Sequence, residues 1–331
     1  DRKLPGRYRL YGIGSVHFTY RDGVMNGRDT NIGMSPGALV WSRFRRHTPA
    51  VISDVVLSLL ALAALIAPLA ETYMALDGNA VDLFNRFQPP STTHPFGTDE
   101  LGRDLLVRLL YGGQVSLFIG LTAAVFSAVV GTGIGLIAGY RGGRTDALLM
   151  RLTDGVIALP LLPLLIVLAA LDLSKLGLPA AIVNAENVSL YRIIVIVALV
   201  GWTTVARLVR GSALALREQA FVKAAEAQGA GTIRIMLVHI LPNLASPIIV
   251  ATTLAAGNII LLESVLSFLG LGIQPPIPSW GNLLTNAQEL IWEAPALAFY
   301  PGALIFITVI ACNFLGDGLQ EALDPRTVRR S

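Results

Sequence analysis

The sequence predicts an all-α membrane protein of about six transmembrane helices, because of its composition, its long apolar blocks and the distribution of its basic residues. The 331 residues are 53% hydrophobic and only 14% charged, and the mean hydropathy is +0.63. An ordinary soluble domain has roughly 25% charged residues. This chain therefore lacks the polar residues that would cover a water-exposed surface.

The apolar residues form six blocks, and each block is a predicted transmembrane helix. About 20 predominantly apolar residues cross the hydrocarbon core as a helix, and the blocks lack the in-out alternation of a membrane barrel. The fourth block is the weakest, because it is short and lies between Arg192 and Arg207. The blocks are residues 49–70, 112–140, 147–171, 193–206, 240–262 and 294–316. Prolines inside them predict kinks, at Pro160, Pro163, Pro247 and Pro301.

The basic residues predict that both termini face the cytoplasm. Connections on the N-terminal side of the membrane carry 20 Lys and Arg, and those on the other side carry 5. Cytoplasmic loops hold the excess of these residues in membrane proteins. The net charge of +3 follows from this distribution and gives no reason to expect a nucleic-acid partner.

The ends of the chain carry little functional information. The first 33 residues are polar, basic and aromatic, with no apolar segment of the signal-peptide kind. Because Met34 is a plausible start, we expect these residues to be either an upstream extension or a remnant of cloning. Cys312, the only cysteine, lies inside the last block and is expected to be a small packing residue.

The longest cytoplasmic connection after the first block, residues 207–239, contains a predicted short helix over 218–229, with the sequence EQAFVKAAEAQG. Small residues and one phenylalanine share a face at helical spacing, with Lys223 and Glu226 beside it. This periodicity alone fits a linker at the membrane surface as well as a docking helix. The face consists of Ala220, Phe221, Ala224, Ala225 and Gly229.

The same loop resembles the EAA loop of ABC importer membrane subunits, in which Glu-Ala-Ala precedes a Gly and a later Leu-Pro. The spacing matches, although Lys223 stands where Glu is usual and His239 where Ile is common. The resemblance implies a coupling helix that docks into a groove of an ATPase subunit. It places at this interface Phe221, Lys223, Ala224, Ala225, Glu226, Gly229 and Pro242.

A second segment, residues 94–104 with the sequence HPFGTDELGRD, precedes the second block on the predicted outer side. Its chemistry predicts a turn followed by a helix start. Thr98 would cap this helix, with Asp99 and Glu100 in its first turn, and Asp104 would pair with Arg108.

This segment also closely resembles the C-type permease subunits of dipeptide, oligopeptide and nickel importers. The resemblance extends over residues 94–326, with further matches at 139–143, 154–160, 239–243, 278–281, 316–319 and 324–326. The residues of the outer-side family motif are Gly97, Thr98, Asp99, Gly102, Arg103 and Asp104.

The sequence shows no catalytic or metal centre. The four histidines, His17, His47, His94 and His239, fall on opposite sides of the predicted membrane without metal-ligand spacing. No GxxxxGK[ST] phosphate loop occurs. The glycines of the second block are instead predicted to allow close helix packing, at Gly131, Gly135 and Gly139.

Three acids lie within or beside the blocks: Asp54, Asp154 and Glu263. Charge at membrane depth is costly. We expect structural roles near the ends of the spans, such as reaching headgroups, capping a helix or pairing with Arg151. The alternative is a polar lining of a substrate path.

The resemblance implies a type I ABC importer permease fold and a transport subunit that is not an enzyme and has no cofactor of its own. Its implied partners are a homologous second permease, two cytoplasmic ATPases that bind ATP and Mg, an extracellular binding protein and the lipid of a bacterial inner membrane. The implied substrate is a dipeptide or oligopeptide, with a nickel chelate as an alternative. A secondary transporter driven by an ion gradient, with Asp154 or Glu263 as coupling acid, is a different possibility. A membrane enzyme would need a clustered polar site.

The implied organisation has four parts. Residues 1–48 form the cytoplasmic N-terminal segment, and 49–111 the first helix with an outer loop. Residues 112–318 form the permease core, with its coupling loop at 207–239, and 319–331 the cytoplasmic tail.

Overall fold

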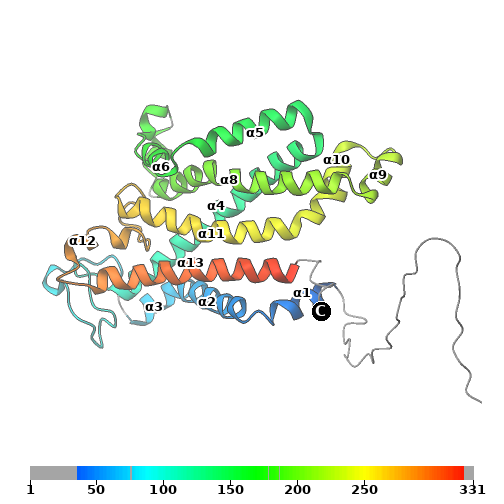
Figure 1. The fold of residues 1–331 in the computed structure, drawn as a ribbon. Coiled ribbons are helices and arrows are strands. Elements are labelled where there is room, and N and C mark those ends of the chain that lie inside the picture. Colours follow the sequence, from blue (N-terminus) through cyan, green and yellow to red (C-terminus); the bar gives the residue numbers. More distant parts are fainter. Residues whose placement is uncertain (1–35, 75–76, 178, 186, 324–331) are drawn as a thin grey trace, which may run out of the picture.

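The structure, a computed structural model, describes residues 36–74, 77–177, 179–185 and 187–323. The expectations for residues 1–33 and 324–326 lie outside the described residues. Long helices lie along one common direction, with α4 running obliquely between the layer of α5 and α8 and the layer of α11, α13 and α2 (Figure 1). The longer helices are α1 (Pro36–Phe44), α2 (Thr48–Leu65), α3 (Ala67–Met74), α4 (Leu105–Arg141), α5 (Gly143–Ala158), α6 (Leu161–Ala169), α8 (Val188–Arg217), α9 (Ala220–Ala227), α11 (Ala245–Phe268) and α13 (Ala296–Leu323).

Short helical elements lie in the connections between these longer helices. They are η1 (Leu83–Asn85), η2 (Leu173–Leu176), α7 (Ala180–Val183), α10 (Thr232–Arg234), the π-helix η3 (Ile235–Ile240), η4 (Leu241–Leu244), η5 (Asn282–Leu284) and α12 (Ala287–Leu290). In the described part of the chain, the only β-type pairing is an isolated bridge between Thr98 and Asp104. The predicted all-α class is therefore confirmed.

Among the described residues, five helical stretches are long and apolar enough to cross a membrane, and a bent pair of helices makes a sixth candidate. The five are α2, α4, α8, α13 and the run Thr232–Phe268, which continues from α10 into α11. The bent pair is α5 and α6. The predicted count of about six spans is confirmed.

The third predicted span is broken rather than kinked. α5 and α6 meet at 83°, and Leu159 between them is extended, with ψ 137°. The residue before a proline is disfavoured in the helical region, so Pro160 explains the break. Pro163, Pro247 and Pro301 lie within α6, α11 and α13.

The fourth predicted span is much longer than its uncharged block. α8 has 30 residues and continues through the arginines that bound the block on its C-terminal side. Arg207 pairs with Asp154 of α5 at 2.5 Å, and Arg210 pairs with Asp146 at 2.5 Å. Two acids of α5 thus pair with two arginines of α8. The helix therefore continues past the end of the uncharged block, residues 193–206.

The contact between α4 and α8 depends on three glycines of α4. A β-carbon built on Gly131, Gly135 or Gly139 would lie 2.5, 2.5 or 2.7 Å from a carbonyl oxygen of α8. No side chain fits at these distances, so glycine allows the two backbones to touch.

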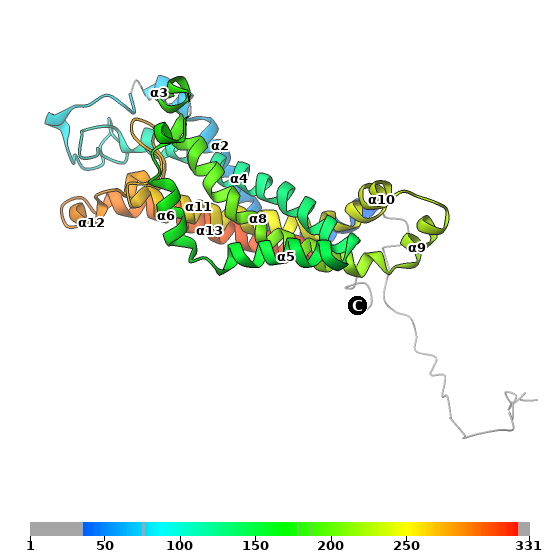
Figure 2. The same cartoon turned by 90° about the horizontal axis from the view of Figure 1, so that it is seen from above.

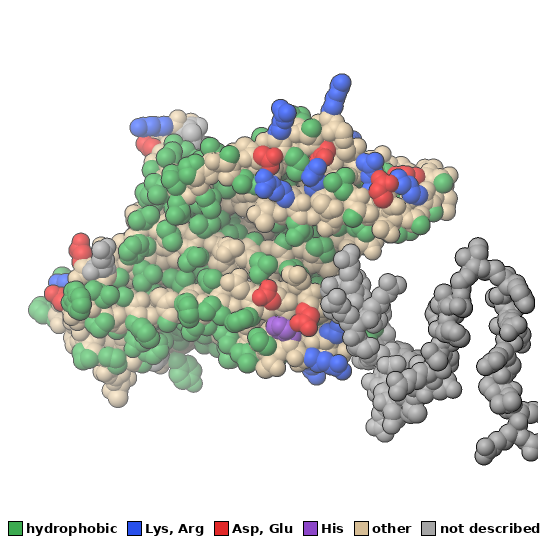
Figure 3. All heavy atoms as spheres, viewed as in Figure 1, with side chains coloured by type: hydrophobic (Ala, Val, Ile, Leu, Met, Phe, Trp, Pro, Cys, Tyr) green, Lys and Arg blue, Asp and Glu red, His purple; other side chains and the backbone are tan. Residues whose placement is uncertain are grey.

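The bundle has two ends of different character. The α9 end contains α9, α10, the start of α1 and the end of α13, whereas the loop end contains α3, α12 and the long connections (Figures 1 and 2). Figure 3 shows charged side chains gathered toward the α9 end and hydrophobic side chains covering much of the middle. We use these two names below.

Candidate functional site

Helix α9 lies on the loop between α8 and the run that leads into α11. Its inner face packs on the protein's own core, because Val222 is fully buried and Ala225 is 7% exposed. Both belong to a cluster that includes Ile235, Ile240 and Leu244. The short helix is thus held against the bundle by apolar contacts on one side.

The outer face of α9 is open. Phe221 is 43% exposed, and Ala224 is also exposed. Lys223 lies beside them and pairs with Glu218 at 3.3 Å and with Glu226 at 4.0 Å. A large aromatic ring and a small residue therefore share an accessible surface, with the paired charges of Lys223, Glu218 and Glu226 beside it.

The structure divides the predicted coupling residues. Ala225 was expected at the interface, but its side chain faces the core beside Val222, because α9 packs this face on Ile235 and Ile240. Pro242 is exposed and lies in η4, after the π-helix and outside α9 itself. Gly229 ends the helix with a φ of +81°, a left-handed conformation that glycine adopts readily.

Polar contacts join the α9 loop to the end of α4. The Tyr140 hydroxyl donates to Glu226 Oε1 at 3.2 Å. Arg217, the last residue of α8, donates from Nη1 to the Tyr140 carbonyl at 3.0 Å. The α9 loop and the last residue of α8 therefore both contact the end of α4.

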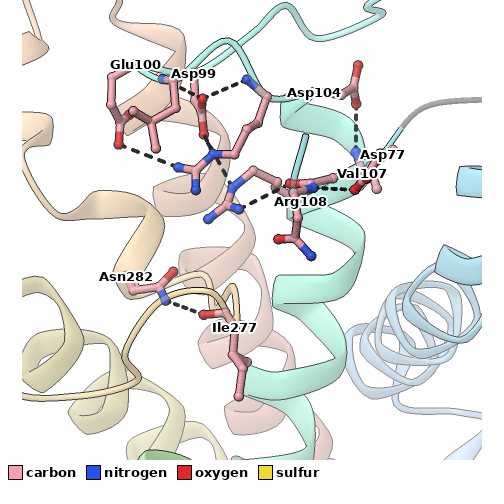
Figure 4. A network of polar contacts seen from close by, with 12 residues as sticks. Asp77, Asp99, Glu100, Asp104, Val107, Arg108, Ile277 and Asn282 are labelled. Atoms are coloured by element: carbon pink, nitrogen blue, oxygen red, sulfur yellow. Dashed lines mark hydrogen bonds and ion pairs between the residues drawn. The ribbon is translucent and has the colours of Figure 1, made fainter. Parts of the chain in front are cut away.

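At the loop end, Asp99 organises residues 97–104. Its Oδ1 accepts from the Leu101 and Arg103 backbone N–H groups at 2.9 and 3.0 Å, and its Oδ2 accepts from Arg103 Nε at 2.7 Å. Arg108 Nε lies 3.4 Å from the same Oδ2, as Figure 4 shows. One buried carboxylate thus holds two arginines and closes the turn.

The helix start differs from the sequence expectation. Asp104, not Thr98, caps α4, and its Oδ1 accepts from the Val107 N–H at 2.9 Å (Figure 4). Asp104 also lies 3.0 Å from His94 Nδ1, instead of pairing with Arg108. The Thr98 hydroxyl donates to the Asn85 carbonyl at 2.5 Å.

The reason for this difference is the backbone of the turn. Gly97 and Gly102 have φ values of +78° and +76°, and they fold residues 97–104 back before the helix begins. A β-carbon on Gly102 would lie 1.8 Å from the Asp82 carbonyl oxygen. Residues 97–104 therefore form a tight turn that packs against Asp82, the residue before η1, and α4 starts only at Leu105.

Glu263 is the residue whose environment the sequence did not reveal. It was expected near a span end, in reach of a headgroup or an arginine. Instead it is fully buried, and serine hydroxyls from α4, from α11 and from the loop after α11 donate to its carboxylate. They belong to Ser116, Ser267 and Ser279. Ser267 lies one turn away on the same helix, but Ser116 and Ser279 come from other segments, and their approach leaves no signal in the local sequence.

The other two acids of the blocks lie at the surface. Asp54 is exposed on α2. Asp154 pairs with Arg207 of α8, not with Arg151 of its own helix. In the parts of the chain that the structure describes, no group of three or more His, Cys, Asp or Glu is placed to hold a metal ion.

These features define a class of protein: a polytopic helical membrane protein in which a short surface helix between two spans is bonded to a third span. The C-terminal part, residues 131–329, matches the family described as "Binding-protein-dependent transport system inner membrane component". Residues 35–90 match the family described as "N-terminal TM domain of oligopeptide transport permease C".

Relatives in several bacteria are similar over nearly their full length. The chain is 38% identical over 284 residues to the oligopeptide transport system permease protein OppC of Bacillus subtilis, covering 86% of this chain and 88% of that protein. It is 37% identical over 298 residues to the dipeptide transport system permease protein DppC of Alkalihalophilus pseudofirmus, covering 90% and 92%. It is 41% identical over 286 residues to the glutathione transport system permease protein GsiD of Escherichia coli, covering 86% and 89%.

The chain therefore belongs to the family of binding-protein-dependent transport system inner membrane components. It is a multi-pass inner-membrane protein and the permease subunit of a binding-protein-dependent importer. The resemblance that the sequence motifs indicated is confirmed.

Proposed function

We propose that this chain is one of two permease subunits of an ATP-driven importer of small peptides. The names of its relatives refer to oligopeptide, dipeptide and glutathione transport. Glutathione is itself a short peptide, so these names share one substrate class. A homologous second permease would complete the translocation path, and an external binding protein would deliver the peptide.

The observation that carries the ATP-driven mechanism is the exposed face of α9. Phe221 and Ala224 present a surface that a groove on an ATPase subunit can accept, while Val222 anchors the helix from below. The energy source is then outside this chain, and two ATPase subunits with bound ATP and Mg supply it. Closure of the ATPase pair would displace α9 and, through Tyr140 and Arg217, the ends of α4 and α8.

The proposal places the α9 end in the cytoplasm and the loop end outside, where the binding protein docks. The described start of α1 and the described end of α13 both lie at the α9 end (Figure 1), so both termini would be cytoplasmic. The asymmetry of Lys and Arg in the sequence supports the same orientation.

The test is to place charge on the exposed face of α9 in the full complex. We expect Ala224→Glu and Phe221→Glu to abolish co-purification of the ATPase subunits and peptide uptake, because a buried unpaired carboxylate opposes docking. Ala80→Glu makes the same charge change at an exposed alanine of the loop end and should leave co-purification unchanged. Gly229 is unsuitable for this test, because its positive φ makes any substitution strain the helix end.

Two outcomes would refute the proposal. If both Ala224→Glu and Phe221→Glu still bind the ATPase subunits, the exposed face of α9 is not the coupling surface. Uptake that follows an ion gradient and persists without ATPase subunits would identify a secondary transporter instead.

A further inference from the structure

The unexplained group in this permease is the buried carboxylate of Glu263. It lies on α11, six residues after Gly257, which packs on α13. Its Oε1 accepts from the hydroxyls of Ser267 at 2.7 Å and Ser279 at 2.9 Å, and its Oε2 accepts from Ser116 at 3.2 Å. No basic side chain of the described residues forms an ion pair with it. Serine hydroxyls, and no basic side chain among the described residues, therefore compensate its burial.

The same three hydroxyls accept hydrogen bonds from the backbone of residues 269–282, which run from the end of α11 to the first residue of η5 and which we call the 269–282 loop. Each serine oxygen therefore donates to Glu263 and accepts one loop N–H. The three bonds run from Trp280 N to Ser116 Oγ, from Ile273 N to Ser267 Oγ and from Asn282 N to Ser279 Oγ, each at 3.1 Å.

This arrangement depends on the chemistry of a carboxylate. A hydroxyl has one donor and two acceptor sites, and both side-chain oxygens of Glu263 act as acceptors. With Glu263 as the shared acceptor, all three O–H groups point inward and their lone pairs remain free for the loop amides. An apolar residue would leave the hydroxyls to turn toward other acceptors, and an amide side chain would bring two N–H groups that need acceptors themselves.

Packing makes the loop part of the helix bundle at this point. Trp280 is 2% exposed, and its Nε1 donates to the Leu109 carbonyl of α4 at 3.0 Å. A β-carbon on Gly281 would lie 2.6 Å from Ser264 Cα, and one on Gly272 would lie 1.9 Å from Ser267 Oγ. Backbone approaches this close allow little movement of the loop while the hydroxyls stay in place.

The part of the loop held in this way forms one wall of a cavity of about 280 Å³ at the loop end. Pro276, Ile277 and Pro278 line this wall, and Arg108 and Tyr111 of α4 line another. Asn282 supports the wall directly, because its Nδ2 donates to the Ile277 carbonyl at 2.7 Å (Figure 4). The position of the loop therefore sets the shape of the cavity.

We propose that Glu263 is a positioning residue for transport: through Ser116, Ser267 and Ser279 it clamps the 269–282 loop onto α4 and α11. This inference rests on the proposed function, in which the loop end receives the binding protein. A clamped loop gives the binding protein a fixed surface and ties that surface to two spans. When the binding protein docks on the 269–282 loop, a movement of this loop would also move α4, which contacts the α9 loop at its other end.

The first test measures hydrogen exchange in the assembled complex. Glu263→Leu should accelerate exchange of the peptides that contain Ile273, Trp280 and Asn282 by about tenfold or more, because the acceptors of their amides lose orientation. Glu263→Gln should give a smaller change, since its oxygen still accepts. Exchange in the centres of α4 and α8 should stay as in the wild type.

Ser279→Ala removes the hydroxyl that joins Glu263 to the Asn282 N–H and changes the packing volume little. This variant replaces Glu263→Leu in the experiment if the Glu263→Leu complex does not assemble. Its matched control is Ser127→Ala. Ser127 is fully buried, and its hydroxyl has no hydrogen-bond partner among the described residues. Ser279→Ala should accelerate loop exchange, and Ser127→Ala should not. Unchanged loop exchange, or equal acceleration throughout the helices, would overturn the clamp.

The second test separates positioning from structural support. Glu263→Leu and Ser279→Ala should raise the concentration of loaded binding protein that half-maximally stimulates ATPase activity by about tenfold, while basal ATPase activity of the complex stays unchanged. Wild-type stimulation in these variants would overturn the positioning role, as would an equal loss of basal activity. If the wild-type complex itself shows no stimulation, the proposed function fails, whereas the exchange experiment still reports on the clamp.

Discussion

Asp104 shows how one side chain determines where a transmembrane helix begins. Its carboxylate caps α4 through the Val107 N–H and contacts His94 on the preceding turn. The side chain is only 1% exposed, so water cannot replace these bonds. The helix therefore starts at Leu105, seven residues before the apolar block of the sequence.

We predict that Asp104→Ala lowers the stability of the detergent-solubilised protein by about 1 kcal/mol or somewhat more, the usual cost of losing an N-cap. Asp104→Asn keeps an oxygen that can accept the Val107 N–H but removes the charge opposite His94. It should therefore retain most of the stability, as measured by thermal unfolding. Equal losses in the two variants would mean that the contact with His94, and not the cap, matters.

Gly135 provides a second test at this scale, because its contact with the Ala206 carbonyl leaves no room for a side chain. Gly135→Ala should destabilise the protein by about 1–3 kcal/mol, the usual cost of overpacking. Gly133 lies on the same helix with nothing within 4 Å of a built β-carbon. Gly133→Ala should thus leave the thermal midpoint unchanged or raise it, since alanine favours helix more than glycine does.

At the scale of elements, the break between α5 and α6 has a local cause that can be removed. Pro160 restricts Leu159 to an extended conformation, and α5 and α6 are regular helices up to the residues on either side of this break. We predict that Pro160→Ala makes the two helices more nearly collinear. Spin labels near residues 148 and 167 should then give a longer mean distance than in a matched Pro163→Ala protein, since Pro163 lies within α6.

The number and order of the elements could be predicted because lipid leaves a chain few options. Apolar blocks of sufficient length must become helices, and the helix over 220–227 follows from its own periodicity. The length of α8 could not be predicted in this way. Arg207 and Arg210 look like the end of a span until Asp154 and Asp146 of α5 are known to face them.

Sites built from several segments were the least predictable. Ala225 has the same chemistry as Ala224, and only the packing of α9 on Ile235 and Ile240 decides that one faces the core. Glu263 meets Ser116 across 147 positions of sequence. Without a second sequence to compare, nothing connects these two residues.

For the whole molecule, the orientation in the membrane is the prediction with the widest consequences. Ala80 at the loop end and Gln228 at the α9 end are both exposed, and the only native cysteine, Cys312, is buried. In a Cys312→Ser background, we expect Ala80→Cys to react with a membrane-impermeant maleimide in intact cells. Gln228→Cys should react only after the membrane is opened. The reverse pattern would place both termini outside.

One helix gives this permease its mechanical continuity. α4 has 37 residues, and at about 1.5 Å per residue it measures roughly 55 Å, well beyond the roughly 30 Å of a hydrocarbon core. It must tilt or protrude. One end contacts the α9 loop through Tyr140, and the other contacts Trp280 of the 269–282 loop through Leu109. A stiff rod of this length behaves as a lever: a small rotation about its middle moves both ends in opposite directions. Events on the two faces of the membrane can then be linked by one rigid body, without a relay of separate local changes.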